Sequence, residues 1–163
     1  MSQRGWTRAT ALRAGAVMAG VALAGSVALA QTVKSIGTYS SWTAFTHGEG
    51  QSLLCFATAQ PTKQEPAGAK RNPAFVYVSS WPKDGVKAEI SVRVGYPLKN
   101  GSDVTMSVGN ASFKLFVHGD RAYIADAGEE LKVIETMRKG SSMTVVGTSV
   151  RGTTTTDTYS PAG

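Results

Sequence analysis

The chain contains few side chains that could act as nucleophiles, bases or metal ligands. Cys55 is the single cysteine and lies among apolar residues. A thiol in this setting is usually a small buried hydrophobe, and the alternative is an unpaired thiol that bridges to a partner or to a second copy. His47 and His118 stand beside glycines, where turns with solvated polar residues are common. These three residues are too few for a four-ligand zinc site, so we expect no metal and no cofactor.

Hydrolytic chemistry by a catalytic triad has no signature in the sequence. A triad needs a nucleophilic Ser or Cys, a His and an orienting carboxylate in one pocket. The nearest approach to a G-x-S-x-G elbow surrounds Ser149, where Arg151 stands in place of the last glycine. We therefore predict a non-enzymatic protein with no catalytic residues.

Three aromatic residues are candidates for a binding surface. Trp42, Trp81 and Tyr96 lie on or near the ends of expected strands, where rings can form a platform for a sugar or a peptide. The alternative is that these rings pack in the core, as large aromatics often do. The sequence leaves both alternatives open.

The first thirty residues resemble an export signal. Three arginines and no acid precede an apolar stretch rich in Ala and Gly, and Ala28, Leu29 and Ala30 form the A-x-A pattern of signal peptidase sites. Cleavage after Ala30 would make Gln31 the first residue of the mature protein. The apolar stretch is short for a membrane span, so we predict a cleaved Sec-type signal peptide over 1–30 and no transmembrane span after cleavage. The expected location is periplasmic, envelope-associated or secreted.

Most of the positive charge belongs to this leader. The chain has 17 Lys and Arg against 11 Asp and Glu, a formal net charge of +6. Removal of Arg4, Arg8 and Arg13 lowers that charge to +3. The remaining bases form no face interleaved with stacking aromatics, so we expect no nucleic-acid partner.

Alternating hydrophobicity dominates the rest of the chain. From Val86 to Val94 apolar residues occupy every second position, the pattern of a strand with one buried face. Asp84 and Gly85 supply turn chemistry before that strand, and Gly109 and Asn110 do so for a later hairpin. The loop at 60–72 is expected to be the longest.

One segment has helical rather than strand periodicity. Asp126 can cap a helix with Glu129 three places on, and Gly140 can end it. Leu131, Ile134 and Met137 would then share one face. This predicts one short helix over 126–139.

Together these elements predict an all-β fold of about nine strands and one helix. Short connections favour antiparallel neighbours, so we expect residues 31–163 to form a single antiparallel β-sandwich or flattened barrel.

Three stretches of this strand-and-turn sequence carry a family resemblance. They are residues 89–102 (EISVRVGYPLKNGS), 113–120 (FKLFVHGD) and 139–159 (KGSSMTVVGTSVRGTTTTDTY). Through them the chain resembles the invasion-associated locus B family of exported bacterial proteins, over about residues 37–159. The matching residues belong to strands and turns, so they indicate lineage and no mechanism.

The resemblance implies a β-rich bacterial envelope protein without enzymatic activity, named for members linked to entry into host cells. We therefore expect the protein to act through contacts with an unidentified protein in the envelope or on host cells. A homodimer through Cys55 is one form that such contacts could take. The alternative is a periplasmic module that binds a glycan or small molecule with Trp42, Trp81 and Tyr96.

Overall fold

The computed structural model describes residues 32–163, which contain eleven β-strands and one α-helix. The predicted leader and its cleavage site at Ala30 and Gln31 lie outside the described residues. The elements are β1 (Lys34–Tyr39), β2 (Trp42–His47), β3 (Leu54–Ala59), β4 (Lys63–Glu65), β5 (Phe75–Trp81), β6 (Val86–Arg93), β7 (Val104–Val108), β8 (Ala111–His118), β9 (Arg121–Ile124), α1 (Ala127–Lys139), β10 (Met143–Thr148) and β11 (Thr154–Tyr159). Short 3-10 helices at Gly50–Ser52 and Pro82–Asp84 follow β2 and β5.

All the strands belong to one antiparallel sheet with the order β1-β2-β3-β5-β6-β9-β8-β7-β10-β11-β4. The predicted all-β class is therefore confirmed. The sheet is a continuous layer that does not close into a barrel. Two of its strands are additional to the nine that the sequence predicted. They are β1 and β4, and β4 lies within the segment that was predicted to be one long loop.

The core lies along one face of this sheet, which we call the inner face. Val76 of β5, Val92 of β6 and Ala122 of β9 form one cross-strand row and are fully buried. Side chains of a strand point alternately to the two faces, so the alternation read from the sequence decides which residues enter the core. The predicted hairpins β5–β6 and β7–β8 are both present, and the β5–β6 pair has a register irregularity between Ser79 and Trp81.

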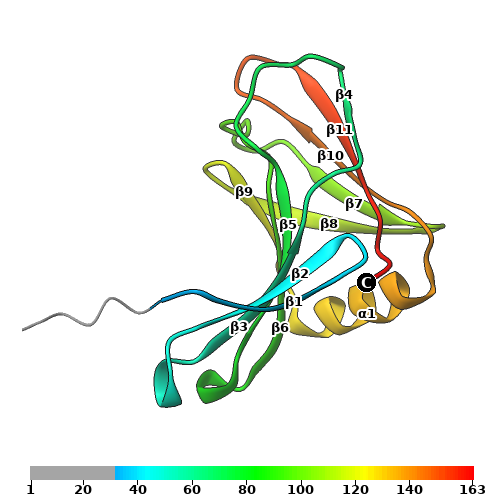
Figure 1. The fold of residues 1–163 in the computed structure, drawn as a ribbon. Coiled ribbons are helices and arrows are strands. Elements are labelled where there is room, and N and C mark those ends of the chain that lie inside the picture. Colours follow the sequence, from blue (N-terminus) through cyan, green and yellow to red (C-terminus); the bar gives the residue numbers. More distant parts are fainter. Residues whose placement is uncertain (1–31) are drawn as a thin grey trace, which may run out of the picture. The chain divides into compact units, whose positions relative to one another are not determined.

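The inner face is bent so that distant strands meet across it (Figure 1). Trp42 of β2 donates its indole N–H to the carbonyl of Ser160, just after β11, over 3.1 Å. The hydroxyls of Tyr96 and Thr155 are 2.5 Å apart. The sheet order places β2 and β11 far from each other, so only strong curvature can bring these partners together.

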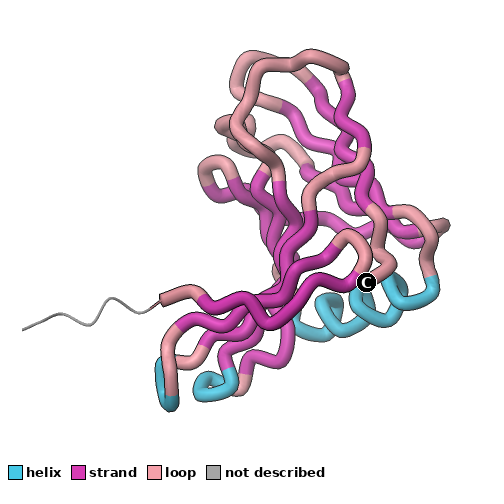
Figure 2. The backbone as a smooth tube through the Cα atoms, in the orientation of Figure 1, coloured by secondary structure: helices cyan, strands magenta, loops and turns pink. Residues whose placement is uncertain are grey.

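The helix covers only part of the inner face (Figure 2). It packs on β6, β7, β8 and β9. Asp126 caps it as predicted, accepting hydrogen bonds from the backbone N–H groups of Gly128 and Glu129. The face predicted to carry Leu131, Ile134 and Met137 is not buried as a whole, because Leu131 is 51% exposed. The helix instead buries Glu130, Val133 and Met137, whose spacing follows the 3.6-residue period more closely.

A buried carboxyl joins the helix to the sheet. Glu130 accepts a hydrogen bond from the backbone N–H of Ile90 over 3.2 Å. The β6–β9 ladder spans only residues 91–93 of β6, so Ile90 needs this side-chain acceptor. Burial raises the pKa of the Glu130 carboxyl, and the neighbouring Glu89 and Asp126 add to the rise.

A buried ion pair connects the β4–β5 segment to β11. Arg71 donates to both carboxylate oxygens of Asp157, and its Nη1 also donates to the carbonyl of Val94 over 3.1 Å. The two side chains are only 5% and 1% exposed. The sequence predicted only a long loop here and gave no sign that Arg71 is buried. The cause of the burial is the pairing with Asp157, which β11 presents to the inner face.

The two edges of the sheet are built differently. The β4 edge is three residues long and carries an exposed ion pair between Lys63 and Glu65, 3.0 Å apart. The β1 edge is longer, has a register irregularity between Ser35 and Gly37, and exposes Ile36.

Replacement of Asp157 by Ala should lower the free energy of unfolding by about 3–5 kcal/mol, because it leaves the Arg71 guanidinium buried without a counter-charge. Urea denaturation monitored by circular dichroism measures this loss. Joint replacement of Arg71 by Met and Asp157 by Leu should recover most of it, since apolar residues can fill such a site.

The matched control is Lys114→Ala, which breaks the exposed Lys114–Asp103 pair. That change should cost less than about 1 kcal/mol. Equal losses for Asp157→Ala and Lys114→Ala would contradict the role assigned to the buried pair.

The raised pKa of Glu130 makes its contribution to stability depend on pH. The carboxyl holds its proton more tightly in the folded than in the unfolded chain, so its contribution is full below the ordinary pKa of 4.5. That contribution declines as pH rises through the folded pKa. Glu130→Gln keeps an acceptor for Ile90 and removes the titration. The wild type should therefore lose stability relative to Glu130→Gln as pH is raised from 4 to 7 in urea titrations. Parallel curves for the two proteins would exclude this coupling.

Candidate functional site

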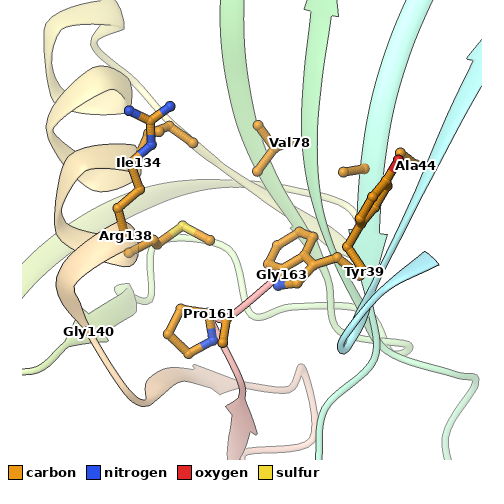
Figure 3. A pocket seen from close by; sticks show the side chains of 12 residues that line it. Tyr39, Ala44, Val78, Ile134, Arg138, Gly140, Pro161 and Gly163 are labelled. Carbon is orange, nitrogen blue, oxygen red and sulfur yellow. The ribbon is translucent and has the colours of Figure 1, made fainter. Parts of the chain in front are cut away.

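A hollow lies where the inner face of the sheet emerges from under helix α1. Its volume is about 560 Å³, within the range of roughly 300–1,000 Å³ that small-molecule sites occupy. Figure 3 shows Ile134 and Arg138 of the helix facing Val78 and Ala44 of the sheet across it. We call this hollow the helix-side pocket; its lining is Tyr39, Trp42, Ala44, Ala57, Val78, Ile134, Met137, Arg138, Gly140, Pro161, Ala162 and Gly163.

Small side chains on neighbouring strands create the space. Ala44 of β2 pairs with Ala57 of β3, which pairs with Val78 of β5. These residues form one row on the inner face, and the helix packs on β6 to β9 rather than over them. Neither long side chains nor the helix fills the volume above this row, so a hollow remains there.

Trp42 forms one wall, and the last residues of the chain lie against it. The indole is 6% exposed and is held by its hydrogen bond to Ser160. At Gly163 an added Cβ would lie 2.4 Å from Cδ1 of Trp42, so only glycine fits so close to the ring. Tyr39 belongs to the same lining, and its side chain is 56% exposed. The indole is thus fixed, whereas the phenol of Tyr39 is open to solvent.

Among the described lining residues, the single charged side chain comes from helix α1. Arg138 stands in the last turn of the helix, where a cation interacts favourably with the helix dipole. Its Nη1 lies 3.2 Å from Oε1 of Glu135, and both side chains are well exposed. An exposed pair of this kind is weak, so the guanidinium remains available to an anionic group at the pocket.

The chemistry of the lining favours binding over reaction. Within the described part of the chain, no carboxylate, imidazole or thiol side chain lines the helix-side pocket. Aromatic rings and aliphatic groups surround one guanidinium instead. Such a surface can desolvate an apolar molecule and orient one negative end.

The three predicted aromatic residues are not gathered at one place. Trp42 lines the helix-side pocket, Trp81 is the half-buried last residue of β5, and Tyr96 is a buried residue after β6 that lines a different pocket. Burial raises the pKa of the Tyr96 phenol, which the hydrogen bond to Thr155 partly offsets. Of the proposed binding surface, only Trp42 belongs to this site.

Cys55 is a free, half-buried thiol on β3. It pairs in register with Thr46 and Ser80 and lies two residues before Ala57, on the same face of the sheet. The thiol is outside the lining of the helix-side pocket. Its disulfide with a second copy stays a prediction.

The other chemically active residues are dispersed. His47 and His118 are the last residues of β2 and β8, and Ser149 lies between β10 and β11. In the part of the chain that the structure describes, no three His, Cys, Asp or Glu side chains are grouped to hold a metal ion.

Sequence reasoning missed most of the pocket lining. The available signal was the small size of Ala44 and Ala57 in strands whose neighbours are larger. A strand pattern identifies the inner face, but the position of the helix over β6 to β9 follows from tertiary packing. No local pattern therefore shows that this row is left uncovered.

Aromatic rings also gather on the outer face of the sheet. Phe45 of β2 stacks on Phe56 of β3 at 5.1 Å between ring centroids, and Tyr123 of β9 stacks on Phe116 of β8 at 5.3 Å. Between these pairs the Arg121 guanidinium lies 5.2 Å from the centroid of the Tyr77 ring. These residues alternate along their strands with the residues of the inner face.

The chain matches no family model, no curated protein and no solved structure. Among residues 32–163 no helix is long and apolar enough to cross a membrane. The resemblance to the invasion-associated locus B family therefore rests on the sequence stretches alone.

Proposed function

We propose that this protein is an exported, non-enzymatic binding protein that takes up a small aliphatic molecule with one anionic end. The observation that carries the proposal is the helix-side pocket, an apolar hollow of about 560 Å³ with one cation in its lining. The aliphatic part would lie over Ala44, Ala57 and Val78, beside the Trp42 ring. The anionic end would lie toward Arg138.

The export and the family relationship belong to the same proposal. The leader over 1–30 and the three family-like stretches support an envelope protein related to the invasion-associated locus B family. The non-enzymatic part rests on the absence of a catalytic signature from the sequence.

A second candidate is contact with a protein partner, which the sequence favoured. The outer-face aromatic rings support it, since Phe116 is 51% exposed and Lys114 stands two residues before it on the same strand. Exposed rings bordered by a cation suit an acidic partner surface with an apolar centre. Cross-linking in native cells tests this candidate, and loss of the captured partner on Phe116→Ser would support it.

Ligand uptake is tested by Trp42 fluorescence. In a Trp81→Phe background Trp42 is the one tryptophan of residues 31–163. Titration with dodecanoate should change its emission saturably. Ala57→Leu should weaken the change because the longer side chain occupies part of the hollow. Arg138→Gln should weaken dodecanoate binding about two- to fivefold, the range expected for an exposed charge pair, and leave binding of neutral dodecanol unchanged.

The matched control is Thr43→Leu, on the outer face beside Ala44. It adds apolar volume without entering the pocket and should leave binding unchanged. Flat emission with both ligands, or equal losses in Ala57→Leu and Thr43→Leu, would refute the proposed site.

Export is tested by the non-reduced intact mass of the protein from the osmotic-shock fraction of its host. A mass that begins at Gln31 supports cleavage after Ala30. A reducible doubling of that mass would identify the Cys55 homodimer, and the unmodified mass would exclude it. A full-length mass in the cytoplasmic fraction would contradict export.

A further inference from the structure

A second pocket of different chemistry lies at the other end of the inner face. It has a volume of about 240 Å³ and is formed by the β4–β5 segment, the turn between β10 and β11, and Tyr96. We call it the cationic pocket; its lining is Ala69, Lys70, Arg71, Tyr96, Ser149, Arg151, Thr153 and Thr155.

The charge of this lining has one sign. Lys70, Arg71 and Arg151 all contribute to it, and no carboxylate side chain of residues 32–163 does. Arg71 is partly neutralised by Asp157 behind it. Lys70 and Arg151 form no ion pair with the described residues. The pocket therefore keeps a net positive charge that nothing in residues 32–163 compensates.

Hydroxyl groups complete the lining. Ser149 and Thr155 are buried. The Ser149 oxygen accepts a hydrogen bond from the backbone N–H of Thr153 over 3.1 Å, which leaves its own proton free to donate. The pair formed by Tyr96 and Thr155 shares one hydrogen bond and retains a second proton. The pocket thus combines cations with neutral donors.

The pocket is held in place before any ligand enters. The Arg71 guanidinium is fixed by Asp157 and Val94 and lies 5.8 Å from the centroid of the Tyr96 ring. These bonds leave further N–H donors of the guanidinium unused. On the opposite side, the Ser149 N–H donates to Thr153 O over 2.9 Å, which closes the β10–β11 turn. A ligand would meet donors that are already positioned, which favours affinity.

We propose that the cationic pocket binds the phosphate group of a small soluble phosphomonoester. A phosphate dianion matches several cations, and its tetrahedral oxygens can accept from Lys70, Arg71, Arg151 and the hydroxyls together. A carboxylate has fewer oxygens and a single charge, so it uses less of the lining. The site is separate from the helix-side pocket, and its function does not depend on the ligand proposed there.

The test is isothermal titration calorimetry of the mature protein with inorganic phosphate and glycerol 3-phosphate, with acetate at equal ionic strength as the reference. Both phosphates should bind saturably, and acetate at least tenfold more weakly. Lys70→Gln and Arg151→Gln should each weaken phosphate binding about tenfold, since each removes a charge-assisted hydrogen bond. Both side chains are exposed, so the variants should fold, and circular dichroism checks this.

The matched control is Lys83→Gln, which removes the same charge from an exposed turn outside the lining. It should leave phosphate affinity unchanged. Equal weakening in all three variants would overturn the proposal, because it would indicate only a general effect of net charge. Equal affinity for acetate, or no saturable binding, would also overturn it.

A vesicle-binding experiment distinguishes a lipid headgroup from a soluble phosphomonoester as the source of the phosphate group. Sedimentation with vesicles of phosphatidylcholine, with and without phosphatidic acid, measures recognition of a lipid headgroup. Binding to phosphatidic acid vesicles without binding of glycerol 3-phosphate would overturn the soluble-ligand proposal. Binding of glycerol 3-phosphate that is lost in Arg151→Gln, without vesicle binding, would support it.

Discussion

The buried contact between Arg71 and Asp157 joins two distant parts of the curved sheet. A single antiparallel layer of this width has an inner face that must be covered, and one helix covers only β6 to β9. The sheet itself covers the rest of its inner face. The ion pair joins β11 to the β4–β5 segment, and the Trp42–Ser160 hydrogen bond joins the end of β11 to β2. Two charges removed from water are stable only while they remain paired. The intact pair therefore helps to hold the two segments between which the apolar residues of the core pack.

The same geometry produces two pockets of opposite character. Where the helix ends and small residues face it, the inner face is left apolar, and among residues 32–163 Arg138 is the only charged side chain of the lining. Where the ion pair ties two segments together, Arg71 brings its neighbour Lys70 next to the turn that carries Arg151. The helix-side pocket lies over strands that the helix does not cover. The cationic pocket lies where the ion pair joins the β4–β5 segment to β11. Their linings share no residue, so they can be altered independently.

The sequence predicted what depends on neighbours along the chain. The alternation from Val86 to Val94, the turns and the Asp126 cap are local, and each is present. It could not predict that Arg71 would be buried, because its partner lies 86 residues away. The helix face was misread at Leu131, because a carboxyl at Glu130 is needed by the Ile90 backbone, and a hydrophobicity pattern treats that residue as polar surface. The sequence could not predict the positions of the pockets for a similar reason, because they depend on which strands the helix covers.

The unequal edges of the sheet limit how copies of this molecule could associate by strand pairing. The β4 edge is short and charged, which discourages addition of another strand. The β1 edge is longer and exposes Ile36 and Tyr39. In two copies joined antiparallel through β1, both β1 edges would be paired. The only unpaired edges of the joint sheet would then be the two β4 edges. Such growth would stop at a two-fold symmetric pair and would not extend into a fibre.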